Sequence, residues 1–172
     1  MRHPLRRVAA IAIVLSALAL GSGATPASAA ELQGANRFAN APFIQTVGGI
    51  FRGDNFGASR EPGEPQHAST LGGASVWFKW RAIGDGPVRF TTRGSDFDTV
   101  LAVYRGRSVD HLVEVRSNDD VQSGTTWSRV QFQAVDGATY RIAIDGYNGV
   151  PGPPPVERGN YVLRVINFAQ GG

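Results

Sequence analysis

Two glutamates and a histidine lie within seven residues of the chain, in the segment Arg-Glu-Pro-Gly-Glu-Pro-Gln-His-Ala. They are Glu61, Glu64 and His67. Proline at the second place and glycine at the third place of Glu-Pro-Gly-Glu predict a type II turn, because proline fixes φ at about −65° and glycine accepts a positive φ. Such a turn brings the two carboxylates close together. Like charges repel at short range, so the pair needs a cation.

Three readings of this segment follow from its chemistry. The cation is an arginine, either Arg60 or another one of the fold, and the segment is a structural turn; or the cation is calcium, which both carboxylates suit; or the acids and His67 are catalytic. Calcium prefers oxygen ligands, so the histidine is a poor ligand for that ion.

Further acidic residues stand at the ends of expected strands. Asp98 lies in Ser-Asp-Phe-Asp-Thr, and Asp119 and Asp120 end the segment Ser-Asn-Asp-Asp. Together with Glu61 and Glu64 they form the candidate calcium set. Neither the EF-hand register nor the glycine-rich nonapeptide repeat is present. Asp at such places also closes Asx-turns onto the backbone, which is the structural alternative.

Signatures of hydrolases are absent from the sequence. It has no Gly-x-Ser-x-Gly nucleophile elbow and no cysteine, and His67 and His111 are the only histidines beyond His3. Neither begins a His-Glu-x-x-His zinc motif. A glycosidase with paired carboxylates has no fixed motif and stays open. We therefore predict no catalytic residue.

Two aromatic residues are candidate ligand contacts. In Val-Trp-Phe-Lys-Trp-Arg, strand periodicity puts Trp77 on the face opposite Val76, and an outward Trp77 offers a platform for a sugar ring or a peptide. The alternative is that neighbouring arginine and lysine stems and an overlying loop cover it. Tyr147, in Ile-Asp-Gly-Tyr-Asn-Gly, is the second candidate.

The elements that must position these residues are all strands. No apolar pattern of period 3.6 persists beyond the first 29 residues, whereas period-2 segments recur between glycine-rich turns about every 10 to 20 residues. The segment 99–104 is apolar on both faces, so it should lie centrally with both faces covered. We predict one β-sandwich of about eight antiparallel strands, near residues 43–51, 75–82, 88–92, 99–104, 112–116, 128–135, 140–145 and 160–168.

Residues 1–29 are typical of a Sec-type signal peptide. A basic start precedes 13 apolar residues, 8–20, and the segment ends in Ala-Ser-Ala at 27–29. The apolar run is shorter than the roughly 20 residues that span a bilayer. Arg6 and Arg7 leave the twin-arginine route open. The expected mature domain is 30–172, and we expect it to have no membrane span. It should be secreted to the extracellular space, or to the periplasm where the cell has an outer membrane.

Removing the signal peptide changes the charge. The whole chain has 17 Lys plus Arg and 14 Asp plus Glu, and without Arg2, Arg6 and Arg7 the balance is 14 against 14. A neutral mature domain with no basic cluster argues against nucleic acid or an anionic membrane as the main partner. Because the chain has no cysteine, its core or a bound ion must stabilise it.

Several motifs in order resemble the bacterial pre-peptidase C-terminal domain group, over residues 35–168. They are Asn-Arg-Phe-Ala-Asn-Ala at 36–41, the segment at 60–68, Gly-Gly-Ala-Ser-Val-Trp-Phe-Lys-Trp at 72–80, Gly-Ser-Asp-Phe-Asp-Thr-Val-Leu-Ala-Val-Tyr at 94–104, Ser-Asn-Asp-Asp at 117–120 and Tyr-Arg-Ile-Ala-Ile-Asp-Gly-Tyr at 140–147. The resemblance implies a jelly-roll-like sandwich that is not itself catalytic. It also implies a distant relation to collagenase collagen-binding modules, which hold calcium near their N-terminal segment.

The sequence thus predicts a secreted, non-catalytic binding or accessory module that contacts an extracellular polysaccharide or protein. Calcium is the one ion that we consider, and its expected role is to stabilise the fold. The alternatives are a small secreted hydrolase using Glu61, Glu64 or His67, and a partner or inhibitor of a separately encoded peptidase.

Overall fold

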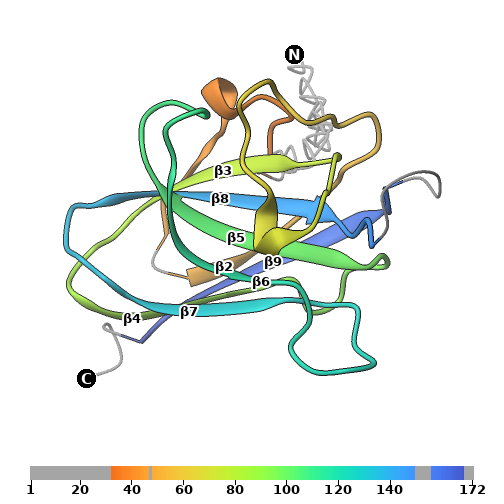
Figure 1. Ribbon diagram of the computed structural model, residues 1–172. Helices are drawn as coiled ribbons and strands as arrows, with labels where there is room; N and C mark the ends of the chain where they lie inside the picture. Colours follow the sequence, from red (N-terminus) through yellow and green to blue (C-terminus); the bar gives the residue numbers. More distant parts are fainter. Residues whose placement is uncertain (1–31, 47, 150–155, 169–172) are drawn as a thin grey trace, which may run out of the picture.

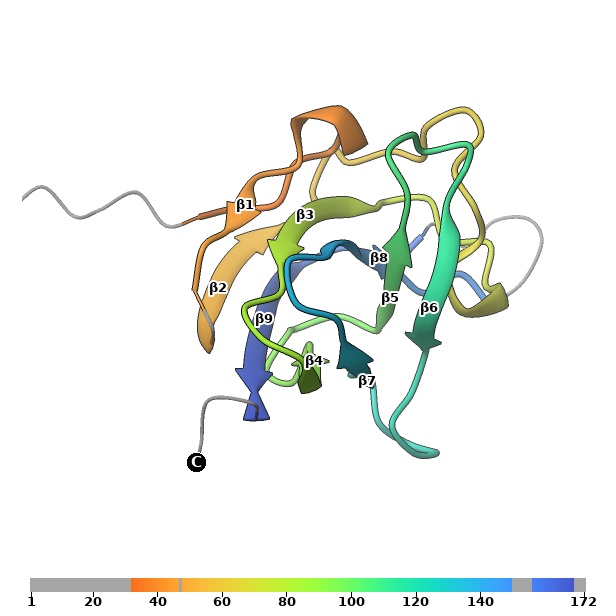
Figure 2. The same ribbon diagram turned by 90° about the vertical axis from the view of Figure 1, so that its left-hand side faces the viewer.

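Nine strands form two sheets that pack face to face in the computed structural model, which describes residues 32–46, 48–149 and 156–168 (Figure 1). Figure 2 shows the two layers from a second direction. The predicted signal peptide at 1–29 lies outside the described residues, as does the start of the mature domain at 30.

Both sheets follow the strand order of a jelly roll. The first sheet has the order β1-β3-β8-β5-β6, with bounds Phe43–Ile44, Val76–Arg81, Thr139–Gly146, Thr99–Arg105 and Val113–Asn118. The second has the order β2-β9-β4-β7, with bounds Gly48–Asp54, Asn160–Asn167, Gly86–Thr91 and Arg129–Ala134. Two short 3-10 helices, η1 (Phe38–Asn40) and η2 (His67–Ser69), lie in the connecting segments.

The main core lies between the sheets and follows the predicted alternation. On β3, Val76, Phe78 and Trp80 point into it, and Phe90 of β4 packs edge-on against Trp80, with ring centroids 5.6 Å apart. Leu163 of β9 is also fully buried there. Apolar side chains at every second position of strands from both sheets therefore close a single core.

A second, smaller core lies on the outer side of the first sheet. Ala102 and Tyr104 of β5 and Ala143 of β8 are buried there beneath Phe38 and Ala41 of the N-terminal segment. The inner strand β5, which lies between β8 and β6, is consequently buried on both faces from Thr99 to Tyr104. This confirms the prediction that residues 99–104 lie inside the sheet with both faces covered.

The predicted strand at 43–51 was wrong in one respect. The chain instead forms β1 and β2, which belong to different sheets: β1 pairs in parallel with β3, whereas β2 pairs antiparallel with β9. The chain crosses from one sheet to the other between Ile44 and Gly48, so one apolar run serves both layers. The other seven predicted strands correspond to β3–β9, and all pairs except β1–β3 are antiparallel.

Truncation of the main core should be costly. Leu101 of β5 is fully buried in it, and Leu101→Ala should lower the free energy of unfolding by about 2 to 5 kcal/mol, because it leaves a cavity between the sheets. Val113 of β6 is 69 % exposed, and Val113→Ala should change the free energy by no more than about 0.5 kcal/mol. Urea unfolding of both variants measures the difference, and equal losses would contradict this packing.

Candidate functional site

The segment Glu61-Pro62-Gly63-Glu64 forms the predicted turn. Gly63 has a φ of +81°, and the Glu64 N–H donates to the Glu61 carbonyl at 3.1 Å. Only glycine adopts this conformation without strain. The prediction of a structural turn is confirmed at the level of the backbone.

The carboxylate of Glu64 turns into the protein, where it meets His67. Glu64 Oε1 lies 2.9 Å from His67 Nε2, and His67 Nδ1 lies 2.7 Å from the Tyr104 hydroxyl. Burial raises the pKa of Tyr104, so this hydroxyl stays protonated and hydrogen-bonds with Nδ1. Because an ionised Glu64 carboxylate only accepts hydrogen bonds, Nε2 is the donor to it, and the three side chains make a continuous hydrogen-bonded chain from η2 to β5.

Two opposing effects set the pKa of Glu64. Burial alone would raise it, but hydrogen bonds from His67 and from the Glu61 N–H outweigh burial and lower the pKa below its ordinary value. The Glu61 N–H donates to Glu64 Oε2 at 2.8 Å. The ionised form of Glu64 is thus the one that the folded protein stabilises.

The predicted arginine partner of these carboxylates is wrong. The Arg60 guanidinium donates to the main-chain carbonyl of Glu64, at 2.6 and 3.2 Å, and not to a carboxylate. Glu61 Oε1 accepts the Phe38 N–H at 2.5 Å, which ties the turn to η1. Each glutamate therefore has protein partners where we expected the pair to need a cation.

The prediction of Trp77 as an outward platform is also wrong. Periodicity placed it on the correct face, but its side chain is 0 % exposed. The rings of Phe38 and His67 pack edge-on against it, with centroids 5.2 and 5.4 Å away, and Tyr104 lies 6.0 Å away. The alternative of an overlying loop is the correct one, because η1 and η2 cover this face.

Asp145 completes the polar part of this covered face. Its carboxylate accepts N–H groups from Gly73, Ala74 and Gly146. One oxygen of Asp145 and the ligand atoms of Glu64 and His67 lie within 4.8 Å of one another, the one such group in the described part of the chain. Every polar atom of the three already has a protein partner, so they stabilise the cover instead of offering ligands.

Asp98, Asp119 and Asp120, which we call the aspartate cluster, lie near enough for their charges to interact, but their carboxylate oxygens do not all come within 4.8 Å of one another. Burial and the charges of Asp120, Asp119 and Glu157 raise the pKa of Asp98 to about 6, and burial and Asp120 raise that of Asp119. In the described structure, one carboxylate oxygen of each aspartate is buried without a hydrogen-bond partner. Unlike Asp145, these aspartates leave a buried acceptor unsatisfied, which costs stability.

Tyr147 lies beside the aspartate cluster. Its N–H donates to the Asp98 carbonyl at 2.9 Å, and its half-buried side chain shares a hollow of about 340 Å³ with Asp119, Asn148 and Leu71. Asn148 Oδ1 is another buried acceptor without a partner among the described residues. The fold therefore brings Tyr147 beside Asp98 and Asp119, two of the five predicted calcium ligands, and leaves Glu61 and Glu64 in separate contacts.

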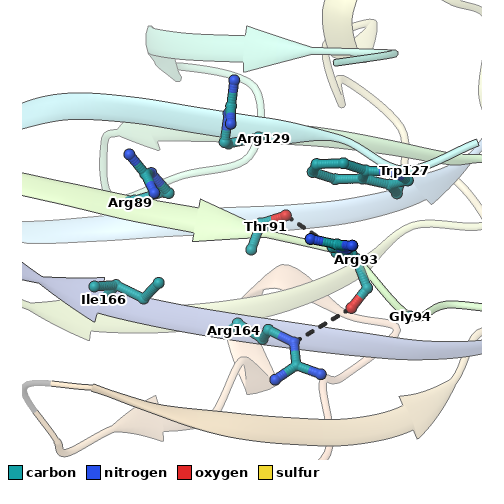
Figure 3. A pocket seen from close by; sticks show the side chains of 8 residues that line it. All are labelled: Arg89, Thr91, Arg93, Gly94, Trp127, Arg129, Arg164 and Ile166. Carbon is teal, nitrogen blue, oxygen red and sulfur yellow. Dashed lines mark hydrogen bonds between the residues drawn. The ribbon is translucent and has the colours of Figure 1, made fainter. Parts of the chain in front are cut away.

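Sequence reasoning missed a cationic site on the opposite sheet. A hollow of about 470 Å³ on the outer face of β4, β7 and β9 is lined by Arg89, Arg93, Arg129, Arg164, Trp127 and Ile166, with Thr91 at its floor (Figure 3). We call it the arginine groove.

Strand register assembles the arginine groove. Thr91 of β4 pairs with Arg129 of β7 on one side and Arg164 of β9 on the other, so the three form one row across the sheet. In the next row, Arg89 lies between Gln131 and Ile166. Because Thr91 is short, the longer side chains around it leave a hollow.

The guanidinium groups of the groove keep donors available. Arg89 binds Gln131 Oε1 with two nitrogens, and Arg164 donates through Nε to the Arg93 carbonyl at 3.3 Å. Arg93 lies over the Trp127 ring, 5.6 Å from its centroid. Within the described ranges, no carboxylate lies within 4.0 Å of these groups or of Arg129. The prediction that the domain has no basic cluster is wrong, because the fold brings together arginines that are far apart in the sequence.

A second cationic hollow lies on the first sheet, lined by Lys79, Arg105, Arg107 and Arg141. Three of its cations already face aromatic rings: Lys79 lies over Phe43, Arg105 over Tyr140 and Arg141 over Phe38. Arg141 is also partly buried, which lowers its pKa. Cation–π contacts are made in both hollows, since Arg89 lies over Phe168 and Arg93 over Trp127 in the arginine groove, whereas Arg129 and Arg164 face no ring of the described residues.

Comparison with known proteins gives similar solved structures only. No protein-family model and no curated protein matches the sequence. The pre-peptidase C-terminal domain of a collagenase from Bacillus anthracis is 10 % identical, with a TM-score of 0.45 over 73 % of this chain and 93 % of that one. PliG, a periplasmic inhibitor of g-type lysozyme from Aeromonas hydrophila, is 14 % identical, with a TM-score of 0.46 over 73 % of this chain and 95 % of that one.

A pre-peptidase C-terminal domain is thus among the solved structures that this chain resembles, as the motifs predict. At these low identities neither likeness assigns a ligand or an activity to the chain.

The buried Glu64 should make stability sensitive to acid. Because its pKa is lowered in the folded state, its contribution is present above the ordinary value of about 4.5 and is lost as the pH falls through the folded value. Between pH 5 and 3 the wild type should lose more stability than Glu64→Gln. Urea unfolding across this range measures the difference.

The matched control is Glu114→Gln, which changes an exposed glutamate on β6. Its loss of stability between pH 5 and 3 should follow that of the wild type. If Glu64→Gln also followed the wild type, the proposed role of the ionised Glu64 would be wrong.

Proposed function

We propose that the protein is a secreted, non-catalytic binding module that holds an extracellular polysaccharide or protein on the outer face of the β2-β9-β4-β7 sheet. The observation that carries this proposal is the arginine groove, in which charged donors without carboxylate partners surround a hollow. Charged groups held in place before binding favour recognition of a complementary partner.

The alternative of a small hydrolase receives less support. Its candidate residues Glu64 and His67 are 4 % and 1 % exposed, and Glu61 is bound to the backbone of η1. A substrate has no access to the first two while η1 and η2 cover the sheet. The alternative of a partner or inhibitor of a separate peptidase is compatible with the arginine groove, since a protein is one of the two ligand classes proposed.

Secretion rests on residues 1–29, whose composition is that of a signal peptide. No helix within the described ranges reaches the length and apolar character needed to cross a membrane.

The second part of the proposal is that calcium stabilises the module at the aspartate cluster. What supports this part is that each of the three carboxylates, and Asn148, has a buried oxygen without a hydrogen-bond partner among the described residues, and calcium prefers such hard oxygen donors. The three carboxylates would have to draw together around the ion, because their oxygens do not all lie within 4.8 Å of one another. Asp98, Asp119 and Asp120 would hold the ion, which would supply positive charge and no reaction chemistry. Glu61 and Glu64 are not part of this proposed site.

Binding to extracellular material tests the first part. Mature protein should be retained on at least one member of a panel of polysaccharides, collagen and isolated cell envelopes, and should turn over none of them. Trp127→Ala should weaken retention about two- to tenfold, because it removes an aromatic side of the groove. Trp77→Phe changes only the covered face and is the control expected to bind normally. Reproducible cleavage of a peptide or glycan would refute the proposal.

A melt with calcium and then with chelator tests the second part. Calcium at 100 times its dissociation constant should stabilise the wild type by about 2.7 kcal/mol, or about 10 °C in Tm. Coincident curves would exclude a calcium site.

Asp98→Asn gives the melt a matched comparison. Because the pKa of Asp98 is raised to about 6 in the folded state, its ionised carboxylate lowers the stability of the folded protein above pH 6. Below about pH 3.8 the carboxyl is protonated in both the folded and the unfolded state, and this loss of stability disappears. In chelator at pH 8, Asp98→Asn should therefore melt above the wild type, by a margin that shrinks as the pH falls through 6. The variant should also lose the calcium response, whereas the surface variant Glu114→Gln should keep it.

A further inference from the structure

The outer face of the second sheet concentrates positive charge in a domain whose expected net charge is zero. Its outward positions include Arg52 on β2, Arg164 on β9, Arg89 on β4 and Arg129 on β7, and Arg93 adds a fifth cation from the β4–β5 turn. Asp54 is the one carboxylate on the outward positions of these four strands within the described ranges. Asp54 and Asp96 line an adjoining hollow together with Arg52.

From this arrangement we infer that the arginine groove binds an anionic polysaccharide, through carboxylate or other acidic groups repeated along the sugar chain. The inference rests on the proposed function and names the chemical class of its ligand. Guanidinium groups bind such oxyanions with two parallel hydrogen bonds, a geometry that a planar fork provides. A polymer with one acid per unit pairs with successive arginines of a row.

The positions of the arginines suit a chain that crosses the strands. Arg129 and Arg164 lie two strands apart with Thr91 between them, which is about 10 Å at ordinary strand spacing. Arg93 lies at the same end of the groove beside Trp127. Trp127 is half-buried, and its ring offers an apolar face to a sugar.

An acidic protein segment fits this face less well. A protein interface has an apolar, fully buried centre surrounded by a polar rim. Here charged side chains are not confined to a rim: Arg164 lies between Thr91 and Ile50, and Arg89 between Gln131 and Ile166, so arginines and apolar side chains alternate across the face. Because no carboxylate lies within 4.0 Å of the guanidinium groups of Arg89, Arg93, Arg129 and Arg164, a bound acid would be the first ionic partner of these four among the described residues.

Titration with defined polymers tests the inference. Polygalacturonate supplies repeated carboxylates and dextran sulfate repeated sulfates, while neutral dextran has the sugar chain without charge and poly-L-glutamate has the carboxylates without sugar. Binding is measured by calorimetry in chelator, so that calcium bridging does not contribute. We expect binding to polygalacturonate or dextran sulfate that weakens steeply with salt, and weaker binding to neutral dextran and poly-L-glutamate.

Variants locate the site. Arg129→Ala with Arg164→Ala should weaken binding of the acidic polysaccharide about 100-fold, at roughly tenfold for each charged hydrogen-bonding group. The control is Arg105→Ala with Arg107→Ala, which removes the same charge from the second cationic hollow and should cause less than a threefold change. Both double variants substitute partly or fully exposed side chains, so thermal melts should confirm that both are folded.

The outcomes separate the two proposals. Retention on no material of the panel would refute the binding function itself. Three results would leave the binding function intact and overturn the assignment of an acidic polysaccharide. They are equal affinity for neutral dextran, tighter binding of poly-L-glutamate, and equal losses of affinity in both double variants.

Discussion

The hydrogen-bonded chain Glu64–His67–Tyr104 is the constraint on which the two faces of the sandwich depend. It fastens η2 to the central strand β5, and the His67 ring packs edge-on against Trp77. Glu61 extends the same contact to η1 through the Phe38 N–H. One sheet is therefore covered by its own loops, and these loops bury Trp77, which strand periodicity places on the outer face. The other sheet keeps an open outer face, on which the arginine groove lies.

Charge is distributed according to the same division. Arginines line the groove on the open sheet face and, with Lys79, the second cationic hollow on the first sheet, whereas Asp98, Asp119 and Asp120 gather at strand ends, each with one buried oxygen unsatisfied among the described residues. A domain of neutral formal charge thus has a cationic face and an anionic loop region. Such a separation directs an acidic ligand to the groove and a cation to the loops without requiring a net charge.

Much of the fold could be predicted from the sequence, because alternating apolar positions in segments such as 140–145 depend on local periodicity alone. The turn at Gly63 was equally local. Strand order is not local, and it decided most of what we missed. Arg129 and Arg164 are 35 positions apart in the sequence and become neighbours only through β4, and Trp77 was misplaced because its cover comes from residues 38 and 67. The aspartates were predictable as a group by their strand-end positions, but their unsatisfied oxygens were not.

The central claim is that the sheet left open by the loops is the binding face. Nitrogen-15 NMR of the arginine side chains and tryptophan indoles tests it most directly, during titration with oligogalacturonate. The account predicts shifts of the Nε resonances of Arg129 and Arg164 and of the Trp127 indole, with Arg105, Arg107 and Trp77 unchanged. Shifts confined to Arg105, Arg107 or Trp77 would contradict it.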